Sequence, residues 1–162
     1  PTYIQSEIKI GENDNYEDVY NNLVKVGKET LDIYFSSHQP YSPIPQNTKL
    51  ATYANKIKKN EIQINFNESA FIVHKKVCAF SPKPGAWFLL DSKKYKIFNT
   101  EIINANIIKN FDKTKKLIFS CKKDYLLVNK IQKEGRNVMA IEDFERGYPN
   151  EFKNIKQKFA IK

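Results

Sequence analysis

Arginine is almost absent from this sequence, although the chain is strongly basic. Of its 27 Lys and Arg residues only Arg136 and Arg146 are arginine, and the net charge is +9. Arginine recognises phosphates and bases through a planar fork of donors, whereas lysine acts as a point charge. A polyanionic partner would therefore be held mainly by charge neutralisation, with little readout of its sequence.

Cysteine, glycine and long apolar runs are also scarce. The two cysteines, Cys78 and Cys121, form no Cys-x-x-Cys pair, and their apolar surroundings predict buried thiols. No metal-binding motif is present. No run approaches the ~18–20 apolar residues that span a bilayer, and no signal peptide is visible, which favours a soluble intracellular protein. With only five glycines, the turns of any β-structure must rely on Asn and Asp.

The basic charge is confined to one part of the chain. Residues 1–40 hold three Lys and seven Asp or Glu, a net charge of −4, whereas residues 41–162 carry +13. A basic excess restricted to one region indicates a polyanionic partner, such as nucleic acid or an anionic membrane. A solvated lysine surface in a chain rich in Lys, Asn and Ile is the alternative.

The first 37 residues do not look like a complete domain. Thr2–Ile10 alternates loosely as a strand would, and Asn15 is placed to cap a helix that ends near Ser36. One strand and one helix cannot enclose a core. We therefore divide the chain into a piece of a larger domain (1–37), a proline-rich linker (38–62) and a folded C-terminal part (63–162).

The C-terminal part has the pattern of a small β-barrel with one packed helix, so the fold class is α+β. Asn67 is expected to cap a helix that ends near Phe80, and the Pro- and Gly-containing stretch 79–87 forms a rigid corner after it. A short helix over 141–146 and a tail with apolar residues at helical spacing follow the strands. The expected strands are 87–90, 95–98, 102–111, 115–121 and 125–131.

Five motifs stand in a fixed order along the chain. They are Ala51-Thr52-Tyr53-Ala54-x-Lys56-Ile57, Ile64-Asn65-Phe66-x-x-Ser69-Ala70, Ala79-Phe80-Ser81-Pro82-x-Pro84-Gly85-Ala86-Trp87, Gln132-x-Glu134-Gly135 and Phe144-x-Arg146-Gly147-Tyr148. In this order they resemble the C-terminal half of methionyl-tRNA formyltransferase, and the resemblance covers about residues 1–148. The corner differs from the family in one place, where Lys83 stands between the prolines instead of the usual Trp.

The resemblance implies both a fold and a function. The family transfers a formyl group from 10-formyltetrahydrofolate to methionyl initiator tRNA, and its catalytic Asn, His and Asp lie upstream of the part resembled here. The present segment would then bind tRNA through its linker and an OB-like barrel. We expect it to lack activity and a bound cofactor of its own. Its expected partners are initiator tRNA and the missing catalytic domain, in a monomer of the bacterial cytosol or an organelle matrix.

The residues expected to touch tRNA are basic side chains of the linker, the helix, the corner and a late loop. For each of them the alternative is that the side chain only contributes to the solvated surface and binds nothing. They are Lys49, Lys56, Lys58, Lys59, Lys75, Lys76, Lys83 and Arg136.

Other conspicuous residues are assigned structural roles. Trp87 follows the corner and is expected in the core, although barrel aromatics of this kind also stack on bases. His74, on the apolar stripe of its helix, is expected to be a core histidine. Glu142 and Asp143 suit the first turn of a short helix, where the dipole favours anions. No nucleophile–base pair, glycine-rich phosphate loop or metal cluster is found.

Two other functions remain open from sequence alone. A sugar N-formyltransferase would share the resemblance but has no need of the basic region. A free-standing nucleic-acid-binding module would need the basic region but not the family motifs.

Overall fold

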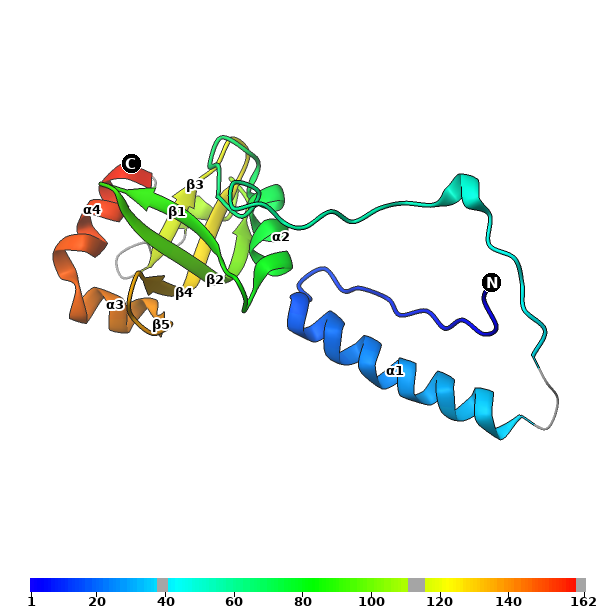
Figure 1. The fold of residues 1–162 in the computed structure, drawn as a ribbon. Coiled ribbons are helices and arrows are strands. Elements are labelled where there is room, and N and C mark those ends of the chain that lie inside the picture. The colour runs from blue at the N-terminus through cyan, green and yellow to red at the C-terminus, as the bar shows by residue number, and fades with distance from the viewer. Residues whose placement is uncertain (38–40, 111–115, 160–162) are drawn as a thin grey trace. The chain divides into compact units, whose positions relative to one another are not determined.

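A computed structural model describes residues 1–37, 41–110 and 116–159 of the chain. It contains two compact units, Pro1–Ile57 and Lys58–Lys162 (Figure 1). None of the helices in the described ranges has the length and apolar content needed to cross a bilayer.

Helix α1 (Tyr16–Ser36) dominates the first unit. Asn15 caps it as expected. Its side chain accepts hydrogen bonds from the backbone N–H groups of Glu17 and Asp18, and the Asp18 carboxylate in turn accepts from the Asn15 backbone N–H. The strand expected over Thr2–Ile10 is wrong. Only a single bridge, between Thr2 and Ile44, occurs there, because no neighbouring strand among the described residues offers a partner.

The first unit has no core of its own. None of its described residues is buried, and many large apolar side chains of α1 are more than half exposed. Apart from α1 it contains one short 3-10 helix, η1 (Thr48–Leu50). Its N-terminal segment is joined to the helix by the edge-on ring pair of Tyr3 and Tyr34 and by a 2.7 Å hydrogen bond from the Thr30 hydroxyl to the Ser6 hydroxyl.

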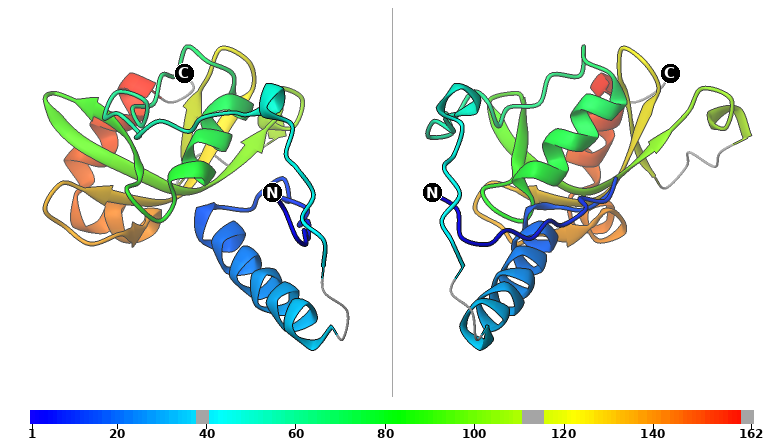
Figure 2. Two further views of the ribbon diagram at one scale, coloured as in Figure 1. Left: turned by 45° about the vertical axis from the view of Figure 1, so that its right-hand side comes forward. Right: turned by 90° about the vertical axis from the view of Figure 1, so that its right-hand side faces the viewer.

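The second unit is a curled antiparallel sheet covered by helices, which confirms the expected α+β, OB-like architecture (Figure 2). The strand order is β1-β2-β4-β3, and β5 extends the sheet beside β4. The strands are β1 (Ala86–Leu90), β2 (Lys93–Ile103), β3 (Leu117–Ser120), β4 (Tyr125–Lys133) and β5 (Met139–Ala140).

Polar residues with positive φ shape the sheet in place of glycine. Asp91 and Ser92 form a two-residue turn between β1 and β2, and both have positive φ, as a type I′ turn requires. Asn99 also has positive φ, at 49°, and accepts a 2.9 Å hydrogen bond from the Asn129 amide on β4. The ladder between β2 and β4 is interrupted at this pair, which helps the sheet to bend.

Two expected element boundaries are wrong for local reasons. Ser69, not Asn67, caps α2 (Ala70–Phe80). The hairpin loop before β4 causes the difference. The Ala70 N–H, which an Asn67 cap would bind, donates instead to the Lys123 carbonyl, and the Lys122 N–H donates to the Glu68 carbonyl.

The separate strand expected over 102–111 is also wrong. Residues 102 and 103 are the end of β2, which continues the strand expected over 95–98. The strand ends at Ile103 because the Asn104 side chain accepts from the backbone N–H groups of Asn106 and Ile107 and starts a turn toward η2 (Ile108–Asn110). Phe111 and Lys115, which the expected strands included, lie outside the described residues.

The core lies on the inner side of the sheet, where α2, α3 (Ile141–Gly147) and α4 (Pro149–Phe159) pack. Val73 and Val77 of α2 and Phe144 of α3 meet the inward side chains of the strands. Helix α4, which the tail pattern predicted, adds the buried Phe152 and Ile155. The ring of its last residue, Phe159, lies 5.2–5.8 Å from Phe66, Phe88 and Phe119.

Candidate nucleic-acid interface

The outer face of the sheet is defined by the alternation of its strands. In β1, Ala86, Phe88 and Leu90 point into the core, so Trp87 and Leu89 point outward. In β2 the buried Tyr95 and Ile97 leave Lys94 and Lys96 on that same outer face. Trp87 is opposite Lys96 in the register. The expectation that Trp87 belongs to the core is therefore wrong: the ring is half-buried, at an outward position of its strand.

A pocket of about 200 Å³ opens on this face. Its walls come from β2 and from the end of β4 with the turn that follows it. The lining residues are Lys94, Lys96, Gln132, Glu134 and Gly135. The Glu134 N–H donates to the Lys94 carbonyl at 3.1 Å, so the turn is fixed to β2, and Gly135 (φ +74°) supplies the left-handed backbone that the turn needs.

The polar atoms of the pocket are only partly used within the fold. The Lys94 ammonium lies 4.9 Å from the centroid of the Trp87 ring, a cation–π contact. The Gln132 amide nitrogen donates to the Arg136 carbonyl at 2.7 Å. In the part of the chain that the structure describes, neither Lys94 nor Lys96 forms an ion pair. The lining thus offers two ammonium groups and one carboxylate.

The Pro–Gly corner packs directly against this face. Gly85 has φ +87°, and a Cβ built on it would come within 3.0 Å of the Lys96 side chain and 2.9 Å of Phe98. The corner therefore needs glycine for its backbone conformation and for this close approach. Lys83, two residues earlier, is exposed. Of the residues predicted to bind tRNA, Arg136 directly follows the pocket residue Gly135, and Lys83 lies two residues before Gly85, which packs against the pocket residue Lys96.

The other predicted residues are spread over both units. Lys49 and Lys56 are exposed in the first unit, and Lys58 and Lys59 are exposed at the start of the second. On α2, Lys75 lies over the Phe71 ring at 5.4 Å.

Lys76 is more firmly engaged within the fold than the other predicted residues. It donates to the Gln63 carbonyl at 3.1 Å and pairs with Glu68 at 3.8 Å. Its ammonium thus already has two acceptors in the free protein.

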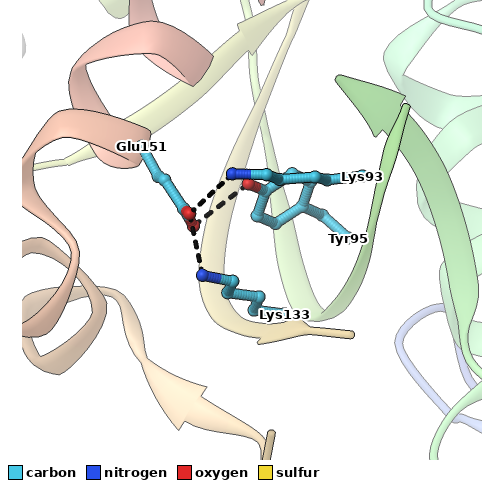
Figure 3. Close-up of polar contacts among 4 residues, drawn as sticks. All are labelled: Lys93, Tyr95, Lys133 and Glu151. Atoms are coloured by element: carbon cyan, nitrogen blue, oxygen red, sulfur yellow. Dashed lines mark hydrogen bonds and ion pairs between the residues drawn. The ribbon is translucent and has the colours of Figure 1, made fainter. Parts of the chain in front are cut away.

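Two further lysines, Lys93 and Lys133, contact α4 through one carboxylate (Figure 3). The Glu151 carboxylate accepts from Lys133 at 2.8 Å, from the Tyr95 hydroxyl at 3.1 Å and from Lys93 at 3.3 Å. Burial alone would raise the pKa of the Glu151 carboxyl, but these hydrogen bonds outweigh it and the pKa is lowered. Burial and the bond to Glu151 raise the pKa of Tyr95. This cluster joins α4 to β2 and β4.

No arrangement suited to covalent chemistry is found among the described residues. His74 is a buried core histidine, as expected: its Nδ1 lies 2.9 Å from the Thr100 hydroxyl and its Nε2 lies 3.6 Å from the Cys78 sulfur. Cys78 and Cys121 are half-buried instead of fully buried. Burial raises the pKa of the Cys121 thiol to about 11, so it is not an activated thiolate.

The remaining acidic residues do not form a catalytic or metal site either. Glu142 and Asp143 occupy the first turn of α3, and Asp143 pairs with Arg146. In the described ranges no three His, Cys, Asp or Glu side chains gather as a metal site would require.

The fold and its sequence define the class of protein. Residues 56–149 match the model of the formyl transferase C-terminal domain, and the chain belongs to that family. The solved structure of HypX from Aquifex aeolicus in complex with tetrahydrofolic acid shares the fold, with a TM-score of 0.59 at 12% identity, over 90% of this chain and 26% of HypX.

Among curated proteins, the chain is similar to methionyl-tRNA formyltransferases, including those of two Rickettsia species. That of Rickettsia massiliae (strain Mtu5) is 31% identical over 146 residues, which are 89% of this chain and 48% of the relative. That of Rickettsia bellii (strain RML369-C) is 31% identical over 134 residues, 82% of this chain and 44% of the relative. The chain therefore spans about half the length of these relatives.

The sequence pattern placed Lys94 in a hairpin turn, where solubility is the commoner role of a lysine, and did not point to Lys96; the structure places both inside β2. A signal for them was present, because Lys94-Tyr95-Lys96 inside a strand must place both lysines on the face opposite the tyrosine. What the sequence could not show is that the turn after β4 folds back to close a pocket over them.

Proposed function

We propose that this chain is the C-terminal part of a methionyl-tRNA formyltransferase and that it binds initiator tRNA. The main support is the similarity to the rickettsial enzymes, which extends over 89% of the chain and so well outside the family domain at residues 56–149. The net charge of +13 over residues 41–162 is consistent with an RNA partner.

The first unit is proposed to be the end of a preceding catalytic domain. None of its residues in the described ranges 1–37 and 41–57 is buried, and Tyr20, Leu23, Val24 and Leu31 of α1 are all 53–56% exposed. Such an apolar stripe on a helix normally packs against a core. Residues 1–37 would complete a Rossmann-like domain, 38–62 would serve as linker and 63–162 would form the tRNA-binding barrel.

Formyl transfer is assigned to that preceding domain. The pocket of about 200 Å³ is smaller than the ~300–1,000 Å³ of sites that enclose drug-sized ligands, so it does not fit a folate. 10-Formyltetrahydrofolate is therefore proposed to act as formyl donor in the catalytic domain, and no step of the reaction is assigned to the residues of this chain.

Binding of tRNA by the 162-residue chain tests the proposal. Lysines that neutralise phosphates release counterions. The logarithm of the association constant should therefore fall linearly with the logarithm of the salt concentration, with a slope of about −0.9 for each phosphate contact on a double-stranded stem. Four contacts among the eight predicted residues would give a slope of about −3.6. Anisotropy of labelled initiator tRNA between 50 and 200 mM KCl measures this slope.

A double variant locates the contacts. Lys56→Ala with Lys58→Ala should weaken binding and reduce the slope by about 1.8, while the melting of the barrel stays unchanged because both side chains are exposed. An elongator tRNA serves as comparison for specificity. Absence of binding at 50 mM salt, or binding that does not respond to salt, would refute the proposed function.

A further inference from the structure

We propose that the outer face of the sheet binds one unpaired nucleotide of RNA, with Trp87 as the stacking platform beside the pocket and with Lys94 and Lys96, which line the pocket, as the phosphate contacts. This inference rests on the proposed RNA-binding function and assigns a specific site to it. It goes beyond general charge neutralisation, because it requires an aromatic ring, ammonium groups and hydrogen-bonding groups in one place.

The aromatic component is Trp87. It is the only Trp of the chain, and it lies at an outward position of β1 with its ring half-buried. The Lys94 ammonium lies over the Trp87 ring at 4.9 Å, so a base that stacks there would take its place and release the ammonium toward the phosphate. Stacking of bases on such side chains is the main sequence-tolerant mode by which OB-like barrels hold single strands.

The ammonium groups are placed to meet the backbone of the same nucleotide. Lys96 is paired with Trp87 across the β1–β2 ladder, and the Lys94 ammonium rests over the Trp87 ring at 4.9 Å. Within the described residues neither forms an ion pair, so a phosphate would not have to displace an acidic partner. Lysine contributes as a point charge, which suits a phosphate without demanding one fixed geometry.

The opposite wall carries groups that can hydrogen-bond a base. Gln132 is held by its bond to the Arg136 carbonyl, and the amide oxygen remains as an acceptor in the described structure. The Glu134 carboxylate is a second acceptor. Carboxylate and amide oxygens accept from the exocyclic amino groups of cytosine, adenine and guanine. The pocket would therefore favour these three bases over uracil, which has no amino group.

The size of the pocket selects the ligand. A volume of about 200 Å³ is below the range of pockets that enclose a drug-sized molecule, so only one base or phosphate group can be enclosed. The bases of a duplex have both faces covered by their neighbours, whereas unpaired nucleotides can be splayed onto an aromatic side chain. The occupant is therefore an unpaired nucleotide and not a stem.

Intrinsic fluorescence provides a readout restricted to this site, because Trp87 is the only Trp. The full chain is titrated with a nine-nucleotide RNA of mixed sequence that carries a distant label, and separately with its duplex. Trp87 emission and label anisotropy are recorded together. We expect the single strand to quench Trp87 with the same midpoint as the anisotropy change, and the duplex to leave the emission unchanged.

The variant Lys94→Gln with Lys96→Gln removes both phosphate contacts and leaves the ring in place. The slope of log affinity against log salt should become shallower by about 1.4. If wild type and variant have the same affinity at 1 M salt, this corresponds to about 25-fold weaker binding of the variant at 0.1 M. The matched control, Lys122→Gln with Lys123→Gln, makes the same charge change at the exposed tip of the other hairpin and should leave the quenching midpoint unchanged.

The outcomes separate this proposal from the proposed function. If labelled RNA and tRNA bind but Trp87 emission does not change, or if the Lys94/Lys96 variant binds as the wild type does, the pocket is not the site while RNA binding stands. Equal quenching by the duplex would overturn the claim that the nucleotide is unpaired. If no RNA binds at all, both proposals fail.

Discussion

Replacing Glu151 by Gln should loosen the attachment of α4 to the sheet. The Glu151 side chain is 19% exposed, and it pairs with Lys133, which is 24% exposed, and with Lys93, which is 58% exposed. Glutamine keeps the size and one acceptor oxygen, so the packing of α4 and the bond from the Tyr95 hydroxyl can persist. The substitution removes only the negative charge from between two ammonium groups.

The expected loss follows from these exposures. The Lys93 pair is largely solvated and contributes at most about 1 kcal/mol. A hydrogen bond to a charged group with limited access to water contributes about 1.5–3 kcal/mol, and the Lys133 pair belongs to this class. Glutamine retains part of that bond, so we expect a loss of roughly 2 kcal/mol in the free energy of unfolding. For a domain of this size this corresponds to a fall of roughly 10 °C in melting temperature.

The dependence on pH separates a charge effect from a packing effect. The folded protein holds the pKa of Glu151 below its ordinary value of 4.5, so this stabilisation is complete above that pH and disappears as the pH falls through the folded pKa. Wild type and Glu151→Gln should therefore differ at pH 7 and converge as the carboxyl is protonated.

Thermal unfolding followed by Trp87 fluorescence measures the second unit alone. Glu142→Gln, an exposed acid in the first turn of α3, is the control and should cost less than about 1 kcal/mol. Equal melting temperatures of wild type and Glu151→Gln at pH 7, or a difference that persists unchanged at pH 3, would refute the reasoning.

Two further predictions concern packing and backbone. Ile155→Ala on α4 removes a fully buried side chain and should lower the free energy of unfolding, measured in denaturant melts, by about 2–5 kcal/mol. The control Asn154→Ala replaces an exposed neighbour and should change it by about 0.5 kcal/mol or less. Similar values for both variants would show that α4 does not belong to the core. Gly85→Ala places a side chain at φ +87° and against a neighbouring strand, so it should destabilise by more than about 1 kcal/mol. Gly27→Ala in α1, with open space around it, should instead raise helicity in circular dichroism, and a neutral Gly85→Ala would contradict the proposed close approach.

Local signals in the sequence were reliable where one residue type has one dominant use. Asn15 followed by acidic residues predicted the start of α1, and the apolar spacing of the tail predicted α4. They failed where a distant segment competes for the same backbone groups. The Lys123 carbonyl accepts from the Ala70 N–H, the donor that an Asn67 cap would have used, and no residue pattern near Asn67 indicates this contact.

The sequence by itself determined the family, the α+β pattern and the concentration of positive charge in residues 41–162, because these follow from residue order, periodicity and composition. Tertiary structure alone decided which lysines act together. Lys93 and Lys133 are drawn to Glu151 on α4, whereas Lys94 and Lys96 are left facing solvent beside Trp87. The physical reason is that adjacent strand residues point to opposite faces, and only the folded sheet determines which face the helices cover and which remains open to a ligand.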